Sequence, residues 1–148
     1  MAGSSLFDHL KVFLRSQAGV NALVGTNAAA RIYLDFAKQN AARPYLVLQM
    51  FPGEAAQSIH TRPNYANARV QIDAYADSSS AAYALAEAVR DSLEHTRNEM
   101  SDGTNTIRTS TDSLGSYQFG SEERTSGSKD RLYWCSRDYE IWHAEEVT

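Results

Sequence analysis

Residues 68–94 read ARVQIDAYADSSSAAYALAEAVRDSLE and join a strand pattern directly to a helix pattern. In the strand part, apolar residues at 70, 72 and 74 alternate with polar residues, which is typical of an antiparallel strand with one solvated face. After the serines, apolar residues recur at helical spacing in one stripe: Ala82, Leu85, Ala86, Val89 and Leu93. The segment therefore predicts an α+β domain in which this helix lies on an antiparallel sheet.

Composition predicts one soluble domain over residues 1–148, since the chain is 43% hydrophobic and carries a net charge of -4. Lys and Arg are scattered, which argues against direct binding of nucleic acid. No apolar run nears the roughly 20 residues that span a bilayer, and no signal sequence is visible, so we expect a cytoplasmic protein without a membrane partner. The single cysteine, Cys135, excludes an internal disulfide and fits a reducing compartment.

Further helix and strand patterns flank the central unit. Helical spacing occurs at residues 5–15 and 18–24, and strand patterns occur at 31–35, 45–51, 106–111 and 131–143. Residues 45–51 are apolar on both faces, which predicts a central strand. Long polar loops are predicted at Pro52–Asn67 and Gly115–Lys129, a polar turn at 96–106, and a bulge at Ser136–Asp138. The predicted fold is α+β, an antiparallel sheet of about four to five strands with two long helices packed on one face.

Residues capable of catalysis or metal binding do not form a recognisable motif. His9, His60, His95 and His143 lie far apart without paired spacing, and we expect His9 and His95 to be solvated on polar helix positions. The glycines are isolated, which argues against a phosphate-binding loop, and no serine lies in a nucleophile motif. We therefore predict no enzyme, no catalytic residue, no cofactor and no metal.

Aromatic residues are concentrated in the predicted strands and support two interpretations. A stacking platform for bases normally comes with a basic groove, which the sequence lacks. Aromatic ribs that pack a sheet are therefore favoured. An exposed aromatic sheet face that anchors a subunit contact is the alternative.

The order of the segments resembles the tail completion family of long-tailed phages, also called tail terminators or tail-to-head joining proteins. The resemblance is carried by RIYLDFAKQNAARPYLVLQMFPG at 31–53, by the 68–94 unit, and by RDYEIWH at 137–143. An amino-terminal helix that ends in a Val-Gly turn precedes them. These motifs cover nearly the whole chain, and their order and spacing carry the match.

That resemblance implies a structural virion protein that forms a homo-oligomeric ring, typically a hexamer. Its implied partners are other copies of itself, the tail tube protein and the head connector or adaptor protein, while genomic DNA passes through the lumen only as cargo. The protein would act in the host cytoplasm during assembly and remain in the virion tail or neck. The alternative is a small ferredoxin-like enzyme or ligand-binding domain, which would require a pocket with convergent polar groups.

The two long polar segments are then candidates for contacts with neighbouring subunits, the tube or the connector. The Gly115–Lys129 segment is longer than the resemblance leads us to expect, so its contacts would be particular to this protein. Three arginines are candidate partners for acidic helix residues of a neighbour, with solvated charge as the alternative. The candidate contact residues are Gln57, Ile59, His60, Arg62, Tyr65, Arg69, Tyr117, Phe119 and Arg124, the arginines being 62, 69 and 124.

Overall fold

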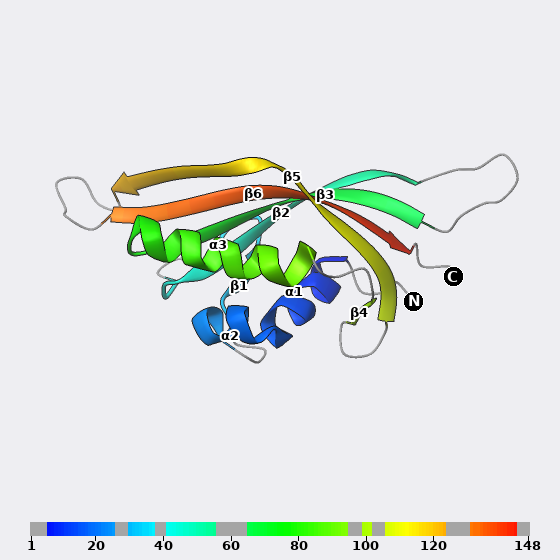
Figure 1. Ribbon diagram of the computed structural model, residues 1–148, viewed down its shortest axis with the longest axis horizontal. Coiled ribbons are helices and arrows are strands. Elements are labelled where there is room, and N and C mark those ends of the chain that lie inside the picture. The colour runs from blue at the N-terminus through cyan, green and yellow to red at the C-terminus, as the bar shows by residue number, and fades with distance from the viewer. Residues whose placement is uncertain are drawn as a thin grey trace, which may run out of the picture.

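A computed structural model describes residues 6–25, 30–37, 41–55, 65–94, 99–101, 106–123 and 131–144. Within these residues, a twisted sheet lies on one side of the molecule and the helices on the other (Figure 1). The elements are α1 (Leu6–Ser16), α2 (Ala18–Val24), β1 (Ile32–Leu34), β2 (Tyr45–Ala55), β3 (Tyr65–Ala76), α3 (Ser79–Glu94), β4 (Glu99–Ser101), β5 (Thr106–Glu123) and β6 (Arg131–Ala144).

The sheet has the strand order β1-β2-β3-β6-β5-β4. Neighbouring strands are antiparallel except β1 and β2, which are parallel. The α+β class is thus confirmed, but the prediction of a purely antiparallel sheet is wrong. Directly after β1, the backbone N–H of Asp35 donates to the Leu48 carbonyl of β2 and extends this parallel pairing.

The helical layer differs from the predicted pair of long helices on the sheet. Only α3 is long, and it packs directly on β3, β5 and β6. The shorter α1 contacts α2 and β4, and α2 contacts α3 and β2. The amino-terminal helices therefore form a layer beside and beneath α3 (Figure 1).

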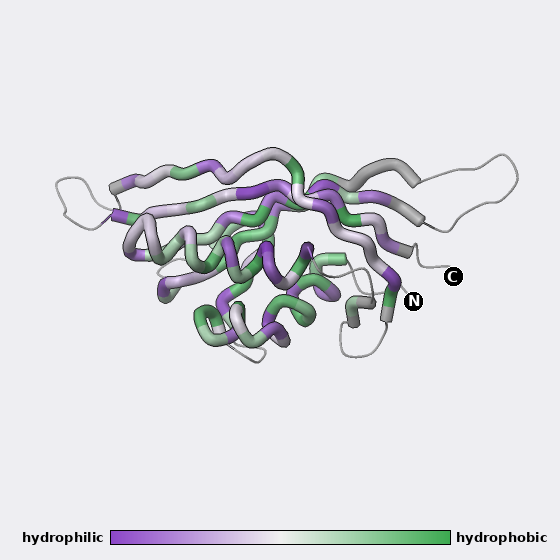
Figure 2. The backbone as a smooth tube through the Cα atoms, in the orientation of Figure 1, coloured by the Kyte–Doolittle hydropathy of each residue, from purple (hydrophilic) through white to green (hydrophobic). Residues whose placement is uncertain are grey.

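The core lies between α3, the amino-terminal helices and one face of the sheet. The whole predicted stripe of α3 is buried, together with Leu10 and Leu14 of α1 and the alternate apolar residues of β3. β2 is covered on both faces as predicted, because Leu46 and Leu48 join this core while Tyr45 and Val47 belong to a second cluster on the opposite face. Figure 2 shows hydrophobic residues in the helices and central strands, whereas β5 along the border is mostly pale or hydrophilic.

Both predicted long loops prove to be partly strand. β2 continues to Ala55 and β3 begins at Tyr65, which leaves residues 56–64 of the predicted loop outside the described residues. β5 runs through most of the segment predicted as a loop after residue 115, because its ladder with β6 continues beyond an irregularity between Leu114 and Gln118. The extra residues of this bulge lie in β5, opposite the β6 segment where the bulge was predicted.

Two further predictions are corrected. The predicted polar turn at 96–106 contains β4, which pairs with the start of β5. His9 is buried, not solvated, because α1 lies against this unpredicted strand. His143 lies in β6 beside Thr109, while His60 and His95 fall outside the described residues. No helix in the described part of the chain has the length and apolar content to cross a membrane.

Candidate subunit-contact surfaces

The face of the sheet away from α3 carries a row of aromatic rings across four strands. Tyr33 of β1 meets Tyr45 of β2 edge to face with centroids 5.9 Å apart, and Tyr45 stacks on Tyr75 of β3 at 5.0 Å. The centroid of the Tyr75 ring lies 6.4 Å from that of Trp134 on β6. Burial, and next the Asp73 carboxylate, raise the pKa of Tyr75 to about 12. These contacts support the interpretation of the aromatic residues as packing ribs.

The row ends on β5, where Gly120 lies beneath the Trp134 ring. A Cβ atom at position 120 would lie 2.0 Å from Cζ2 of that ring. Only a residue without a side chain permits this approach. The row of aromatic rings therefore covers the sheet face away from α3 continuously from β1 to β5.

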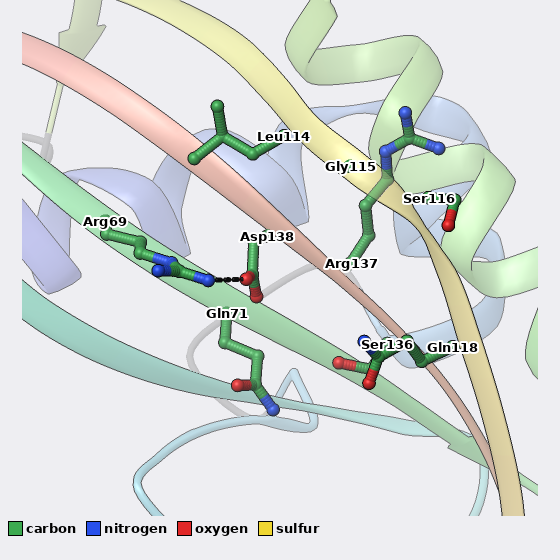
Figure 3. A pocket seen from close by; sticks show the side chains of 9 residues that line it. All are labelled: Arg69, Gln71, Leu114, Gly115, Ser116, Gln118, Ser136, Arg137 and Asp138. Carbon is green, nitrogen blue, oxygen red and sulfur yellow. Dashed lines mark hydrogen bonds and ion pairs between the residues drawn. The ribbon is translucent and has the colours of Figure 1, made fainter.

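A polar groove of about 490 Å³ opens on the same face, beside the β5 bulge (Figure 3). Its lining residues are Arg69, Gln71, Leu114, Gly115, Ser116, Gln118, Ser136, Arg137 and Asp138. The Arg69 guanidinium forms an ion pair with the Asp138 carboxylate across β3 and β6. Arg69 therefore already pairs with a carboxylate of its own chain, and a contact with a neighbouring subunit would have to compete with this ion pair.

On the helix side, α3 and β5 share an exposed aromatic cluster. Tyr83 lies 5.3 Å from Tyr117 and 6.0 Å from Phe119 between ring centroids. The Arg137 guanidinium lies 4.7 Å from the centre of the Tyr117 ring. Tyr83 and Phe119 are both exposed, so this cluster presents an apolar patch to solvent.

Hydrogen bonds and ion pairs connect β5 beside this cluster to acidic residues of α3. The Tyr117 hydroxyl donates to Glu87 Oε1 at 2.7 Å, and that hydrogen bond is the largest cause that lowers the pKa of Glu87. Ser113 Oγ donates to Glu94 Oε1 at 2.6 Å and lowers the pKa of Glu94 in the same way. The Arg90 guanidinium lies 3.0 Å from the Glu94 carboxylate and 3.8 Å from that of Glu87, so one arginine of α3 pairs with both carboxylates.

The structure brings together only part of the predicted contact set. Tyr117 and Phe119 meet on the helix side, whereas Arg69 lies on the opposite face of the sheet. Tyr65 begins β3, and its side chain is not described. The other predicted contacts lie outside the described residues: Gln57, Ile59, His60, Arg62 and Arg124. Sequence analysis missed Tyr83, because its place on α3 outside the apolar stripe gave no sign of an aromatic neighbour on β5.

The lone cysteine is a core residue of β6. Burial raises the pKa of the Cys135 thiol to about 11, which keeps it protonated and unreactive near neutral pH. The thiol therefore serves as a small packing group in the core.

Comparison with known families identifies the type of protein. Residues 9–144 match the tail completion protein gp17 family. The chain belongs to this family. It is thus a structural protein of a phage-type virion tail, in a family that is not one of enzymes, and the resemblance noted in the sequence is confirmed.

One solved structure agrees with this chain in fold. One chain of a structure titled "Virion of native gene transfer agent (GTA) particle" superposes with a TM-score of 0.64 at 21% identity, and the match covers 95% of each chain. A second solved chain is 18% identical over 94% of this chain and 96% of that chain, but its TM-score of 0.43 is too low to support an argument. No curated protein sequence matches significantly.

Proposed function

We propose that this tail completion protein is a ring subunit, six to a ring, that caps the finished tail tube and joins it to the head connector. The observation that carries the proposal is the family match over residues 9–144, because capping and joining are what the resemblance to this family implies. The proposed partners are other copies of the chain, the tail tube protein and the connector. DNA passes through the lumen as cargo, and assembly takes place in the host cytoplasm.

The geometry supports a role in binding. The aromatic cluster on α3 and β5 is exposed on a rigid part of the molecule, since Tyr117 is tied to Glu87 and packed beside Arg137. Heterologous contacts between copies close into a ring when the rotation between neighbours closes. No covalent bond is made or broken in such a mechanism, and a net charge of -4 suits a lumen through which DNA slides without sticking.

The contact residues predicted from the sequence remain part of the proposal. Residues 56–64 contain Gln57, Ile59, His60 and Arg62, and we assign them to contacts with the tube or the connector. Tyr65 and Arg124 border the segments that join β2 to β3 and β5 to β6. Tyr65, at the start of β3, is in a position that suits a contact with the part above or below a ring.

An affinity pull-down tests the role directly. The tagged full chain is recovered from cells that produce its virus or express its native operon, and bound proteins are identified by mass spectrometry. We expect tail tube and connector proteins. A variant that cannot fold, such as one with Leu85→Asp in the buried stripe of α3, serves as a control for nonspecific capture. Recovery of metabolic proteins alone would contradict the assembly role.

The alternative of a ligand-binding domain has one supporting observation, the polar groove beside the β5 bulge. Binding of a small molecule there would stabilise the folded chain and raise its melting temperature. A shift that is lost on Gln71→Ala would favour this function over the structural role. The internal pairing of Arg69 with Asp138 argues against a charged ligand, because the ligand would have to compete with that pair.

A further inference from the structure

We propose that the free chain forms a two-fold dimer, in which the outer edges of β5 from two copies pair antiparallel over residues 118–122. The exposed rings of Tyr83 and Phe119 from both copies pack together on the helix side of the joint sheet. This inference concerns the free protein and goes beyond the proposed role in the tail, so either proposal can fail alone.

The short strands at the two ends of the sheet are poorly suited to take a further strand. β1 has three residues, and local hydrogen bonds occupy both ends of its outer edge. The backbone N–H of Ile32 donates to the Ala30 carbonyl at 2.9 Å, and that of Phe36 donates to the Leu34 carbonyl at 2.8 Å. β4 is equally short and lies against α1. Short edge strands of this kind are protected against pairing with another chain.

β5 has a longer open edge after its bulge. β4 pairs with β5 only at Thr106–Arg108, so the described remainder of β5 has β6 on one side and no strand on the other. Figure 1 shows this part of β5 along the border of the sheet. No described residue forms a backbone hydrogen bond to Phe119 or Ser121 outside the ladder with β6. Unpaired edge groups are templates for a further strand.

The alternation of backbone groups identifies the residues of β5 that point outward. Within a strand, the N–H and C=O groups of successive residues point to opposite sides. In β2, the N–H of Leu46 donates to the Arg31 carbonyl on the β1 side, and the registers carry this alternation across β3 and β6. Gly120 is thereby directed to β6. Phe119 and Ser121 direct their N–H and C=O groups outward.

A second copy is the partner that fits this edge. Because β5 carries the long open edge of the described sheet, two copies extend the sheet by joining this edge to itself, which gives a two-fold axis and ends at a dimer. Pairing centred on Gly120 places Phe119 opposite Ser121 of the second copy. Both residues point outward, as hydrogen-bonded antiparallel pairs require. This register also stays within the regular stretch that follows the bulge.

The side chains on the helix side favour this register. Phe119 is 56% exposed and Tyr83 is 42% exposed, and their ring centroids lie 6.0 Å apart. The two-fold axis puts the Phe119 residues of the two copies on a diagonal of the sheet, where a separation of about 7–8 Å keeps aromatic rings within reach. The two exposed patches thus merge into one cluster, which removes apolar surface from water.

The side chains on the opposite face are also compatible with the pairing. Gln118 and Glu122 are both exposed, and the register puts the Gln118 amide beside the Glu122 carboxylate of the second copy. The two Glu122 residues lie four positions apart along the strands, about 14 Å, which exceeds the Debye length of about 8 Å at physiological salt. Gly120 meets Gly120 of the second copy, so no new side chain displaces the Trp134 ring.

The dimer and the proposed ring have different symmetry. Neighbours in a ring of six are not related by a two-fold axis, so the pair has to separate before the copies take their places on the tube. Pairing covers the open edge of β5 in the free protein. Such an edge is otherwise a site of aggregation.

Mixed cysteine variants test the register. Gln118→Cys and Glu122→Cys are purified separately, mixed in equal amounts and oxidised with diamide, and non-reducing gels detect linked dimers. We expect a covalent dimer in the mixture, since directly opposite Cα atoms about 4.5 Å apart suit a disulfide. Each variant alone should stay unlinked, because its two cysteines lie about 14 Å apart in the dimer. The native Cys135 is fully buried and does not compete.

A mixture of Gln118→Cys and Asp112→Cys is the matched control, because Asp112 is exposed but lies before the bulge, outside the paired stretch. Sedimentation equilibrium of the wild type should show a monomer–dimer equilibrium that Phe119→Glu abolishes. Linking in a single variant or in the control would overturn the pairing. Oligomers that give no link in the mixture, or a wild type that is monomeric at every concentration, would overturn it too. The pull-down decides on the tail role independently of these results.

Discussion

At the scale of single residues, Gly120 lets the Trp134 ring lie on the backbone of β5. A methyl group there would lie 2.0 Å from a ring carbon, so the indole or the strand must move. We expect Gly120→Ala to cost about 1–3 kcal/mol of unfolding free energy and to change tryptophan emission. Urea unfolding followed by fluorescence measures both. Gly115→Ala is the control, because its φ of 67° carries a backbone cost of about 1 kcal/mol while no atom lies within 4 Å of the new methyl.

The hydrogen bond from Tyr117 to Glu87 makes its contribution to stability depend on pH. It lowers the pKa of the carboxyl in the folded state, so the stabilisation is present above the unfolded pKa of roughly 4.3 and is lost as pH falls through the folded one. Tyr117→Phe should therefore lower the urea midpoint more at pH 7 than at pH 3. In a Glu87→Gln background the same substitution should act equally at both pH values. An equal effect in the wild-type background would contradict this coupling.

At the scale of elements, the sequence predicts correctly the helices and strands in which the spacing of hydrophobic residues matches the spacing of the buried positions. β3 and α3 are of this kind, because the alternating residues and the helical stripe face one core. β5 was predicted only in part, since Gly115, Ser116 and Gly120 have low strand propensity and the strand exists through its pairing with β6. The sequence analysis consequently assigned Tyr117 and Phe119 to a loop. The structure places both of these predicted contact residues in the exposed aromatic cluster on α3 and β5.

The direction of β1 and the burial of His9 have a common explanation. Both depend on partners that are distant in sequence, β2 for the strand and β4 for the helix that carries the histidine. Local periodicity contains neither the direction in which a strand is entered nor the identity of the element that covers a helix. The polar groove on the sheet face away from α3 was not predicted for the same reason. Its lining residues come from three strands, β3, β5 and β6.

The segment between β2 and β3 provides a prediction at this scale. Replacing residues 56–64 by a short Gly-Ser linker should leave the melting temperature nearly unchanged, because the paired core of both strands is retained. Joining of tails to heads should fail, since the proposed contacts of Gln57, Ile59, His60 and Arg62 are removed. Electron microscopy of particles from complemented cells measures joining. A linker of the same length that keeps Gln57, Ile59, His60 and Arg62 is the matched control, and normal joining by the first variant would contradict the assignment.

At the scale of the whole molecule, association of copies predicts a melting temperature that rises with protein concentration. Neighbours bind only the folded chain, so they stabilise it by about 2.7 kcal/mol at a hundredfold excess over Kd. For a domain of this size, each kcal/mol shifts Tm by roughly 2–4 °C, and a rise of several degrees is expected between micromolar and high micromolar chain. Differential scanning fluorimetry measures it, with mass photometry to follow the oligomer.

A variant of the exposed aromatic cluster on α3 and β5 connects this rise to Phe119, a contact residue predicted from the sequence. Phe119→Glu places a charge where an apolar side chain would be buried between copies, so its Tm should stay flat with concentration. Ala84→Glu adds the same charge at an exposed position of α3 and should follow the wild type. If the wild type itself has a flat Tm and stays monomeric, free copies do not associate, and ring formation must then be templated by the tail tube. Because a template raises the local concentration of copies, the same Phe119→Glu substitution would in that case be expected to block incorporation into tails.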